Sequence, residues 1–337
     1  MSQTFRNVDN KVCGRTDIDL TPVGYKQAEK KNNPLSALLL LIAAALWGFT
    51  FAFQDMGADH IDASSFVAFR SWTACIFLIF VIKIADRQKI AKGLPTGRPE
   101  NRAMRRHYLL GGLICGTALF FAAFIQQVGI AYTSTAKASF ITALYVIFVP
   151  VTCVFRRQFP KAHVWVAVGL GVVGLYLLSF ANGPESINPG DLIMLISALM
   201  WAVQILCVDY FGYSIDGIRL SFYQTLTQGI ISTIVMLFEG LPAMDNVVAA
   251  LPAILFAGIF SSGIAFTLQI IAQGGLDPTA ASLIMCLESV FGAIGGFLFQ
   301  GQTLTSRELA GCAIMFAGIV ISQLPNRSRT AGNESQY

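Results

Sequence analysis

The chain has 337 residues, of which 55% are hydrophobic and only 12% are charged, with a formal net charge of +4 at neutral pH. An ordinary soluble domain carries about 25% charged residues, so this composition excludes a soluble globular protein. The seven cysteines are dispersed without a CxxC pair and the three histidines lie far apart, so no metal site is predicted. No phosphate loop ending in Gly-Lys-Ser/Thr is present, and no cofactor is predicted.

Apolar stretches long enough to cross a bilayer follow one another along the chain. About 20 apolar residues span the hydrocarbon core as a helix. By this measure the sequence predicts an all-α integral membrane protein with ten transmembrane helices, at residues 35–54, 64–83, 108–130, 136–155, 162–181, 190–208, 219–238, 250–272, 278–299 and 308–324. The polar segments 1–34 and 326–337 are predicted to be cytoplasmic tails, and the first shows no secretory signal peptide.

The distribution of Lys and Arg predicts the orientation, because these residues collect in cytoplasmic loops. With the N-terminus inside, 20 of the 23 basic residues fall in predicted cytoplasmic segments, eight of them between Lys83 and Arg106. We therefore predict a multi-pass protein of the cell (inner) membrane with both termini cytoplasmic. Topology accounts for the basic loop without a nucleic-acid partner, and contact with anionic membrane lipid is a candidate additional role that the topology does not require.

The two halves of the chain repeat each other. When residues 38–73 are shifted by 154 positions, Trp47 falls on Trp201 and Asp55 on Asp209, so that each Trp precedes its Asp by eight residues. Five spans in each copy would place the second copy upside down in the bilayer. Inverted repeats are typical of transporters that open alternately to the two sides.

The later spans of each half align at a shift of 143 positions, which pairs Tyr145 with Glu288. The predicted organisation is a first repeat over residues 35–181 (spans one to five), a linker over 182–189 and a second repeat over 190–325 (spans six to ten). Turn-forming residues in the linker favour this division.

Five segments resemble the EamA-type branch of the drug/metabolite transporter superfamily. They are ALWGFTF at 45–51, FVAFRSWTA at 66–74, TSTAKASFITALYVIFVP at 133–150, GDLIMLISALMWA at 190–202 and TAASLIMCLESVFGAIGGFLF at 279–299. The resemblance implies ten helices in two inverted five-helix repeats, no bound cofactor and movement of small metabolites, often outward. The chain departs from the family pattern at Ser289, where Pro is common, and at Gly301-Gln302, where Gly-Glu is common.

Two ionisable residues at bilayer depth are candidates for a substrate site, because charge is costly there. Glu288 lies near the middle of its predicted span. It either binds a cationic part of the substrate, carries a coupling proton or is a structural carboxylate held by a neighbouring helix. Arg70 lies about two turns into the second span. It either pairs with the carboxylate of an amino-acid-like substrate, forms a packing salt bridge or extends toward the interface.

Aromatic and basic residues extend this candidate site. Lys137 and Tyr145 lie eight residues apart on nearly the same helical face. Tyr145 is the repeat partner of Glu288 and is predicted to point into the same cavity, whereas Lys137 is either part of the site or an interfacial anchor. Trp47 and Trp201 lie deep in their spans rather than at the interfaces where Trp concentrates, so they form either cavity walls or ordinary packing.

Four glutamines complete the set. Gln126 and Gln269 are repeat partners, Gln204 corresponds to a threonine in the first half, and Gln224 corresponds to Arg70. Such amides either bind substrate or join helices through hydrogen bonds.

The predicted function is secondary active transport of small organic metabolites by alternating access around a central cavity, with no enzyme activity. Export of amino acids or related compounds is the leading prediction, and a metabolite importer or a nucleotide-sugar-type antiporter is the alternative. A membrane-embedded enzyme or a structural membrane protein are the other classes; the first would need clustered catalytic groups and the second would not need charge at depth. The predicted partners are a small-molecule metabolite, membrane lipid and a candidate coupling proton, and a homodimer is compatible with the sequence.

Overall fold

A computed structural model of the chain describes residues 33–133, 135–155, 162–179, 189–301 and 305–322, and all regular secondary structure in these ranges is helical. The helices, in chain order, are α3 (Pro34–Ala58), α4 (Ala63–Ala91), α5 (Arg102–Ile130), α6 (Thr135–Ala143), α7 (Tyr145–Phe155), α8 (Ala162–Ser179), α9 (Pro189–Phe211), α10 (Gly217–Glu239), α11 (Met244–Phe256), the π-helix η1 (Ala257–Ala265), α12 (Phe266–Gln273), α13 (Pro278–Met285), α14 (Glu288–Gln300) and α15 (Ser306–Ser322).

Local sequence explains where several helices begin and end. The side chain of Asn33 accepts a hydrogen bond from the first turn of α3, and Asn101 Oδ1 accepts one from the backbone N–H of Met104 at 2.8 Å. Both residues are N-caps, the positions just before a helix, where asparagine is favoured because its side chain accepts a hydrogen bond from an otherwise unpaired backbone N–H of the first turn. Gly240 and Gly301 follow α10 and α14 with φ of 109° and 68°, a backbone conformation that favours glycine.

Six helical segments are long and apolar enough to cross a membrane, by length and composition. They are Pro34–Ala58, Ala63–Ala91, Arg102–Ile130, Pro189–Phe211, Met244–Gln273 and Pro278–Phe299. Shorter apolar helical segments at Ala138–Val154, Ala162–Gly174 and Leu309–Gly318 overlap the predicted spans four, five and ten. The all-α membrane class is therefore confirmed for the described residues, while the count of ten inverted spans stays a prediction.

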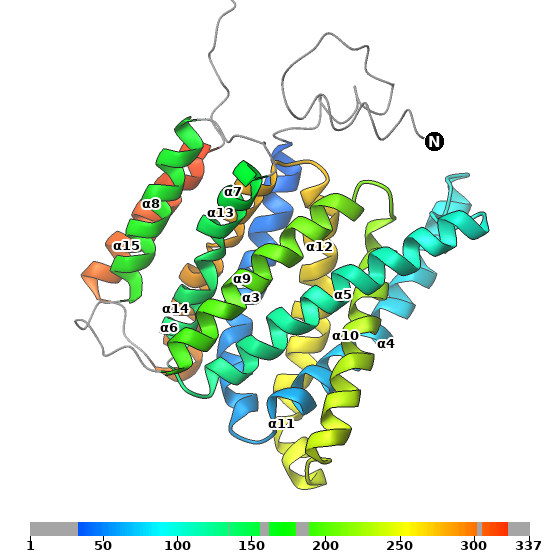
Figure 1. The fold of residues 1–337 in the computed structure, drawn as a ribbon, viewed down its shortest axis with the longest axis horizontal. Helices are drawn as coiled ribbons and strands as arrows, with labels where there is room; N and C mark the ends of the chain where they lie inside the picture. The colour runs from blue at the N-terminus through cyan, green and yellow to red at the C-terminus, as the bar shows by residue number, and fades with distance from the viewer. Residues whose placement is uncertain (1–32, 134, 156–161, 180–188, 302–304, 323–337) are drawn as a thin grey trace, which may run out of the picture.

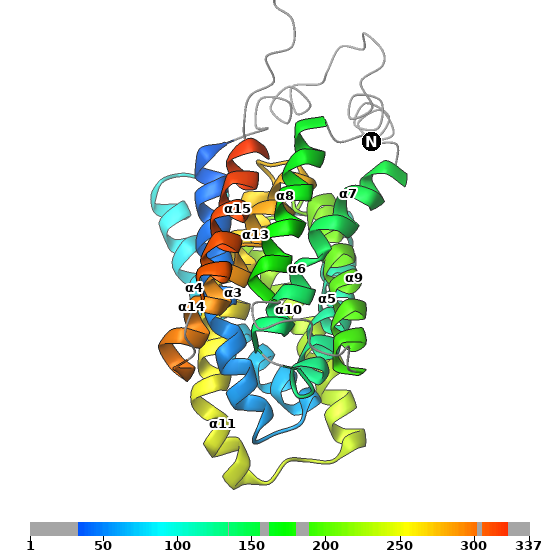
Figure 2. The same ribbon diagram turned by 90° about the vertical axis from the view of Figure 1, so that its left-hand side faces the viewer.

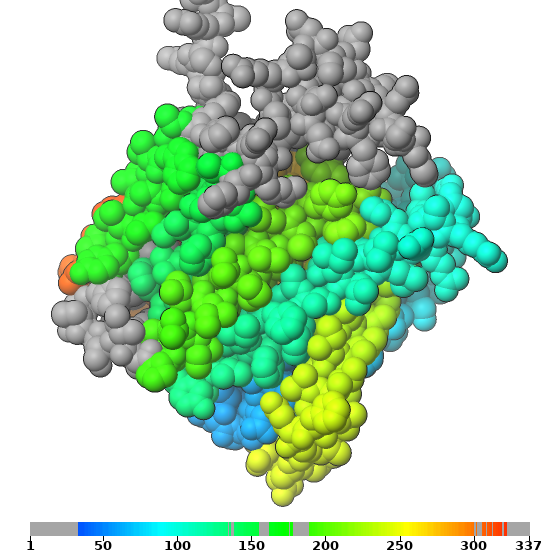
Figure 3. Space-filling model, in the orientation of Figure 1, coloured from blue at the N-terminus to red at the C-terminus, as the bar shows by residue number. Residues whose placement is uncertain are grey.

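The helices form one bundle around α3. In Figure 1, α8 and α15 lie side by side along one edge, and α4, α5 and α10 lie on the opposite side of α3. Figure 2 shows α8 and α15 side by side on the face turned toward the viewer. The space-filling view shows the face on which α5 lies between α9 and α10 (Figure 3), and α5 packs against both. We call the end of the bundle that carries the predicted cytoplasmic loops the inner end, and the opposite end the outer end.

Two pairs of helices are separated by a break inside what the sequence predicts as a single span. Leu144 interrupts the helix between α6 and α7, and Cys286 and Leu287 interrupt it between α13 and α14. Tyr145 is the first residue after the first break, and Glu288 is the first residue after the second. The 143-residue shift aligns these two residues. The second break forms although Ser289 stands where the family that the sequence resembles commonly has proline, so this break does not require proline.

Close helix packing holds the second break against the centre of the bundle. A Cβ atom added to Gly48 of α3 would collide with Cβ of Phe291 and lie 2.6 Å from the carbonyl oxygen of Glu288. Small residues allow such approach between membrane helices. Ser289 Oγ donates a hydrogen bond to the carbonyl oxygen of Ser139 in α6 at 3.1 Å, so α14 contacts both α3 and α6.

Candidate functional site

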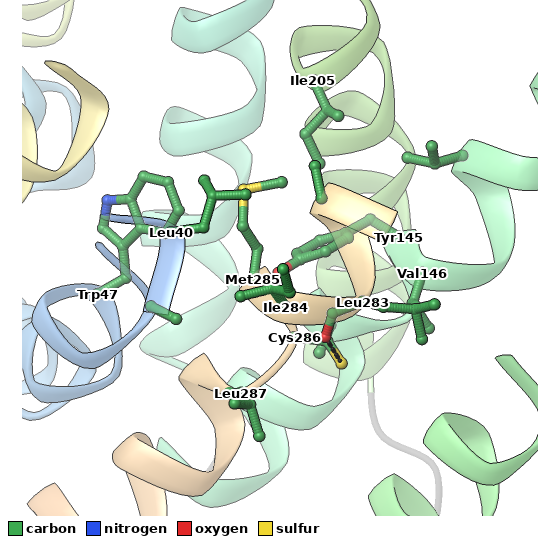
Figure 4. Close-up of a cluster of buried hydrophobic side chains, with 14 of the residues drawn as sticks. Leu40, Trp47, Tyr145, Val146, Ile205, Leu283, Ile284, Met285, Cys286 and Leu287 are labelled. Carbon is green, nitrogen blue, oxygen red and sulfur yellow. Dashed lines mark hydrogen bonds between the residues drawn. The ribbon is translucent and has the colours of Figure 1, made fainter. Parts of the chain in front are cut away.

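A central cavity lies between the helices; its empty volume of about 420 Å³ includes space open to solvent. It is lined by residues that come from both halves of the chain: Trp47, Phe51, Gln54, Arg70, Gln126, Tyr145, Trp201, Ile205, Ser261, Phe266, Gln269, Met285 and Glu288. Figure 4 shows Trp47, Met285 and Tyr145 from three different helices around one region of the buried cluster, with Ile205 beside them. Seven of the ten predicted site residues therefore lie on a single cavity.

Arg70 is held in this cavity by two consecutive serines of η1. Its side chain is only 3% exposed, and it donates hydrogen bonds from Nε to Ser262 Oγ and from Nη2 to Ser261 Oγ, each at 3.0 Å. π-helical segments are frequent at functional sites. A guanidinium group has five donor hydrogens, so these two bonds fix the plane of Arg70 and leave further donors for an anionic group.

Glu288 lies at the second helix break and faces Tyr145 at the first. The carboxylate is 5% exposed, and the Tyr145 hydroxyl is close enough to interact with it. Among the described residues, neither Glu288 Oε1 nor the Tyr145 hydroxyl has a hydrogen-bond partner of normal geometry. Buried polar groups are rarely left unpaired, so this pair is suited to bind a polar group that enters the cavity.

Aromatic rings form one wall of the cavity. The ring centroid of Phe266 lies 5.3 Å from that of Trp47 and 5.9 Å from that of Trp201, with an angle of 26° between the planes of Phe266 and Trp201. The indole N–H of each Trp has no hydrogen-bond partner among the described residues. This wall therefore combines apolar area with two free donors.

The remaining candidates lie at different places. Gln204 does not line the cavity but accepts a hydrogen bond at Oε1 from Nε2 of Gln269, which does, at 3.2 Å. Gln224 in α10 is fully buried, is not among the lining residues, and has no partner for its side-chain amide among the described residues. Lys137 belongs to α6, and its side chain lies outside the described residues.

Several lining residues were missed by the sequence reasoning. Gln54, Phe51 and Met285 line the cavity, as does Ser261, which with Ser262 positions Arg70. Two adjacent serines within an apolar span are the feature of the sequence that could have indicated them. That both hydroxyls reach Arg70 depends on the π-helical backbone of η1.

Ion pairs join helices at the inner end. Asp86 Oδ1 lies 2.7 Å from Nη2 of Arg219, and Asp86 Oδ2 lies 3.0 Å from Nη2 of Arg98. Lys89 Nζ lies 2.8 Å from Asp216 Oδ2. Part of the basic loop thus contacts acidic groups of this chain and links α4 to the start of α10.

No group of three or more His, Cys, Asp or Glu side chains that could hold a metal ion occurs in the described part of the chain. The cavity brings charged groups, aromatic rings and amides together on one surface.

Comparison with known proteins identifies relatives of the chain. A family model described as the EamA-like transporter family matches residues 34–180 and 188–324. An uncharacterized transporter of Archaeoglobus fulgidus is 26% identical over 287 residues, covering 85% of this chain and 84% of the relative. The uncharacterized transporter YoaV of Bacillus subtilis is 23% identical, covering 84% and 94%.

Two further comparisons extend the picture. Protein PecM of Dickeya dadantii is 26% identical over 270 residues, covering 75% of this chain and 88% of the relative. A protein of known crystal structure matches with a TM-score of 0.67 at 16% identity, covering 86% of this chain and 98% of that one. At 16% identity the structural match supports a shared fold and no statement about function.

Proposed function

The chain belongs to the EamA-like transporter family, and we propose that it is a secondary active transporter that exports amino acids or related compounds by alternating access around the central cavity. Family membership and the apolar helices make it a multi-pass membrane transporter. The substrate class, the direction and the mechanism are our proposal. It includes ten spans in two inverted repeats, in the cell inner membrane with both termini cytoplasmic.

Opposite charges on one cavity are the observation that carries the proposal. Arg70 supplies a guanidinium group and Glu288 a carboxyl group, and both line the same space. Guanidinium pairs with carboxylates through two parallel hydrogen bonds, and a carboxylate accepts hydrogen bonds from an ammonium group. A small zwitterion would satisfy both charges, whereas a molecule with only one charged group would leave the other charge unpaired.

The aromatic wall supports a substrate with an apolar part. Trp47, Phe266 and Trp201 line the cavity together with the charged groups, and the ring of Phe266 lies next to both Trp rings. Apolar burial contributes about 25 cal/mol for each Å² removed from water. This contribution would add affinity for amino acids with larger side chains without selecting one of them.

The two broken helices support alternating access. Tyr145 and Glu288 begin the second segments of helices that occupy equivalent positions in the two halves. Discontinuous helices near the midplane are a common way to build substrate sites in transporters with inverted repeats. Under the proposal, the two halves rearrange around the cavity while Arg70 and Glu288 hold the substrate.

A binding experiment tests the substrate class. Thermal unfolding of the purified protein would be measured with amino acids, with amino acid amides that lack the carboxylate, and with the matching carboxylic acids that lack the ammonium group. We expect only the zwitterions to raise the unfolding temperature. Equal stabilisation by either single-charge series would overturn the assignment.

A transport experiment tests the direction. Cells that overproduce the protein would be challenged with toxic amino acid analogues. Resistance supports export, whereas increased sensitivity supports import and removes that part of the proposal.

A further inference from the structure

Glutamine side chains join helices on the outer side of the central cavity. Gln54 of α3 donates from Nε2 to Oε1 of Gln127 at 3.0 Å and to Oε1 of Gln126 at 3.3 Å, both in α5. Gln127 Nε2 in turn donates to the carbonyl oxygen of Gln54 at 3.0 Å. Gln126 Nε2 donates to Thr142 Oγ1 of α6 at 3.2 Å. We call Gln54, Gln126 and Gln127 the outer glutamine cluster.

A second set of three glutamines lies on the inner side of the cavity. Gln269 of α12 donates to Oε1 of Gln204 in α9 at 3.2 Å, and Gln273 Nε2 donates to the carbonyl oxygen of Ile205 at 3.3 Å. We call Gln204, Gln269 and Gln273 the inner glutamine cluster. The two clusters contain the same kinds of hydrogen bond. In each, one glutamine amide donates to another, and a glutamine amide donates to a backbone carbonyl of the neighbouring helix.

Position along the helices places the clusters at opposite ends of the cavity. Gln54 and Gln127 lie near the outer ends of α3 and α5, whereas Gln269 and Gln273 lie near the inner end of α12. Gln54 and Gln126 line the cavity from one side, and Gln269 lines it from the other. Each cluster therefore stands between the cavity and one end of the bundle.

A large hollow lies beyond the outer cluster. It has an empty volume of about 1430 Å³, including space open to solvent, and its lining includes Gln127, Tyr132, Asp59 and Glu239. All of its lining residues come from the outer ends of helices or the loops that join them. Gln127 lines the hollow, and its partner Gln54 lines the cavity, so this reciprocal pair separates the two spaces.

We propose that the outer hollow is the outer mouth of the transport path, that the outer glutamine cluster is its gate, and that the inner glutamine cluster is the matching gate on the other side. This inference rests on the proposed transport function. Opening to the outside breaks the Gln54–Gln127 pair while the inner cluster remains closed, and opening to the inside does the reverse.

The chemistry of the clusters suits repeated opening. Hydrogen bonds between uncharged side chains of membrane helices contribute modestly to association, so they can break and re-form within a transport cycle. When a gate opens, water can pair with the freed amides. Uncharged amides also avoid the large desolvation penalty that ionised groups carry in the bilayer interior.

Cysteine labelling tests the gates without the need for a substrate. In a cysteine-free version of the full chain, Phe51→Cys places one thiol on the cavity. A membrane-impermeant maleimide would be added to right-side-out or inside-out vesicles. Gln127→Ala weakens the outer gate and Gln273→Ala the inner gate, and neither residue lines the cavity.

The two variants should change labelling in opposite directions. We expect Gln127→Ala to raise outside labelling by about three- to tenfold, because it removes both hydrogen bonds between Gln127 and Gln54. Gln273→Ala removes one hydrogen bond, to Ile205, and should lower outside labelling by a similar factor while raising inside labelling. Gln127→Met and Gln273→Met keep the side-chain volume and should change labelling in the same directions as the corresponding Ala variants. They provide a second test if an Ala variant fails to fold. Tyr132→Cys, at a site that is 64% exposed on the outer hollow, is the accessibility control and should label equally in all backgrounds.

Labelling that rises from the outside in both gate variants, or in neither, would overturn the gate assignment. Opposite shifts in a protein that binds no amino acid would leave the gates in place and remove the proposed substrate class. The outcome for the gates is thus separate from the outcome for the proposed function.

Discussion

The break between α6 and α7 and the break between α13 and α14 occur at equivalent positions in the two halves of the chain, but Tyr145 follows the first and Glu288 the second. The same contrast holds elsewhere. Arg70 in the first half corresponds to Gln224 in the second, and only Arg70 lines the cavity. The order of the helices and their breaks is repeated in the two halves, whereas the charged groups are not. This difference suits a transporter whose two similar halves rearrange around a substrate with unlike ends.

Backbone geometry differs between the halves as well. α5 is a continuous α-helix, whereas the corresponding stretch of the second half passes from α11 through η1 to α12. η1 directs Ser261 and Ser262 toward Arg70 of the other half. The irregular segment of one half thus positions the charge of the other, so neither half makes the site alone.

The largest expected effect comes from removing the charge that distinguishes Glu288 from Tyr145. Glu288→Gln should reduce amino acid transport in proteoliposomes by about 30-fold or more, because hydrogen bonds to charged groups contribute about 1.5–3 kcal/mol. It should also flatten the pH dependence of transport. Glu100→Gln, which alters an exposed glutamate in the loop between α4 and α5, is the matched control and should change neither. Full transport with an unchanged pH dependence would remove Glu288 from the site.

Arg70→Gln makes the first half resemble the second at this position. We expect transport to fall by about tenfold, chiefly through weaker binding, because the guanidinium–carboxylate pair is lost. The same carboxylate-containing and carboxylate-free ligands should then stabilise the variant equally. Arg105→Gln removes an exposed arginine at the start of α5 and serves as the control. A variant that still discriminates between the ligands would show that Arg70 does not bind the carboxylate.

Gly48→Ala tests the packing side of the comparison, because the corresponding residue of the second half is Ala202. The added methyl group would meet Phe291 and the backbone of α14. Overpacking of this kind lowers the free energy of unfolding by about 1–3 kcal/mol. Thermal unfolding in detergent would measure the loss. Gly169→Ala, with no atom within 4 Å of the added Cβ, should leave stability unchanged, and equal unfolding temperatures for both variants would argue against close α3–α14 packing.

Tyr145→Phe should have the smallest effect. It removes one uncharged hydroxyl beside Glu288, and we expect a loss of transport of about two- to fivefold, in line with the loss of one hydrogen bond from the hydroxyl to an uncharged group of the substrate. The pH dependence should remain. A loss as large as that of Glu288→Gln would mean that the two residues act as one unit and that the contrast between the breaks is less sharp than proposed.

Much of the candidate site could be predicted from residue chemistry. Arg70 and Glu288 stand out because charge in an apolar span is costly, and the repeat pairing led from Glu288 to Tyr145. Trp47 and Trp201 stand out because they lie deep in their spans. These arguments need only position within a span, which an apolar stretch of about 20 residues defines.

Other parts of the site depend on contacts that no span reveals by itself. The role of Gln54 depends on α3 meeting α5, and that of Ser261 and Ser262 depends on a π-helical turn. Gln224 was predicted to lie at the site because it corresponds to Arg70 in the repeat, but it does not line the cavity. Repeat pairing compares positions within a span, whereas the facing of a side chain depends on local helix geometry and neighbouring packing.

The sequence by itself determined that the chain is an apolar all-α protein with a small set of polar and charged residues at depth, because hydrophobicity and residue spacing are local properties. Only the tertiary structure decided which of these residues share a cavity, where the helices break and how the glutamines pair. The physical reason is that helix breaks and interhelical hydrogen bonds depend on the helices that pack alongside, and these come from distant parts of the chain.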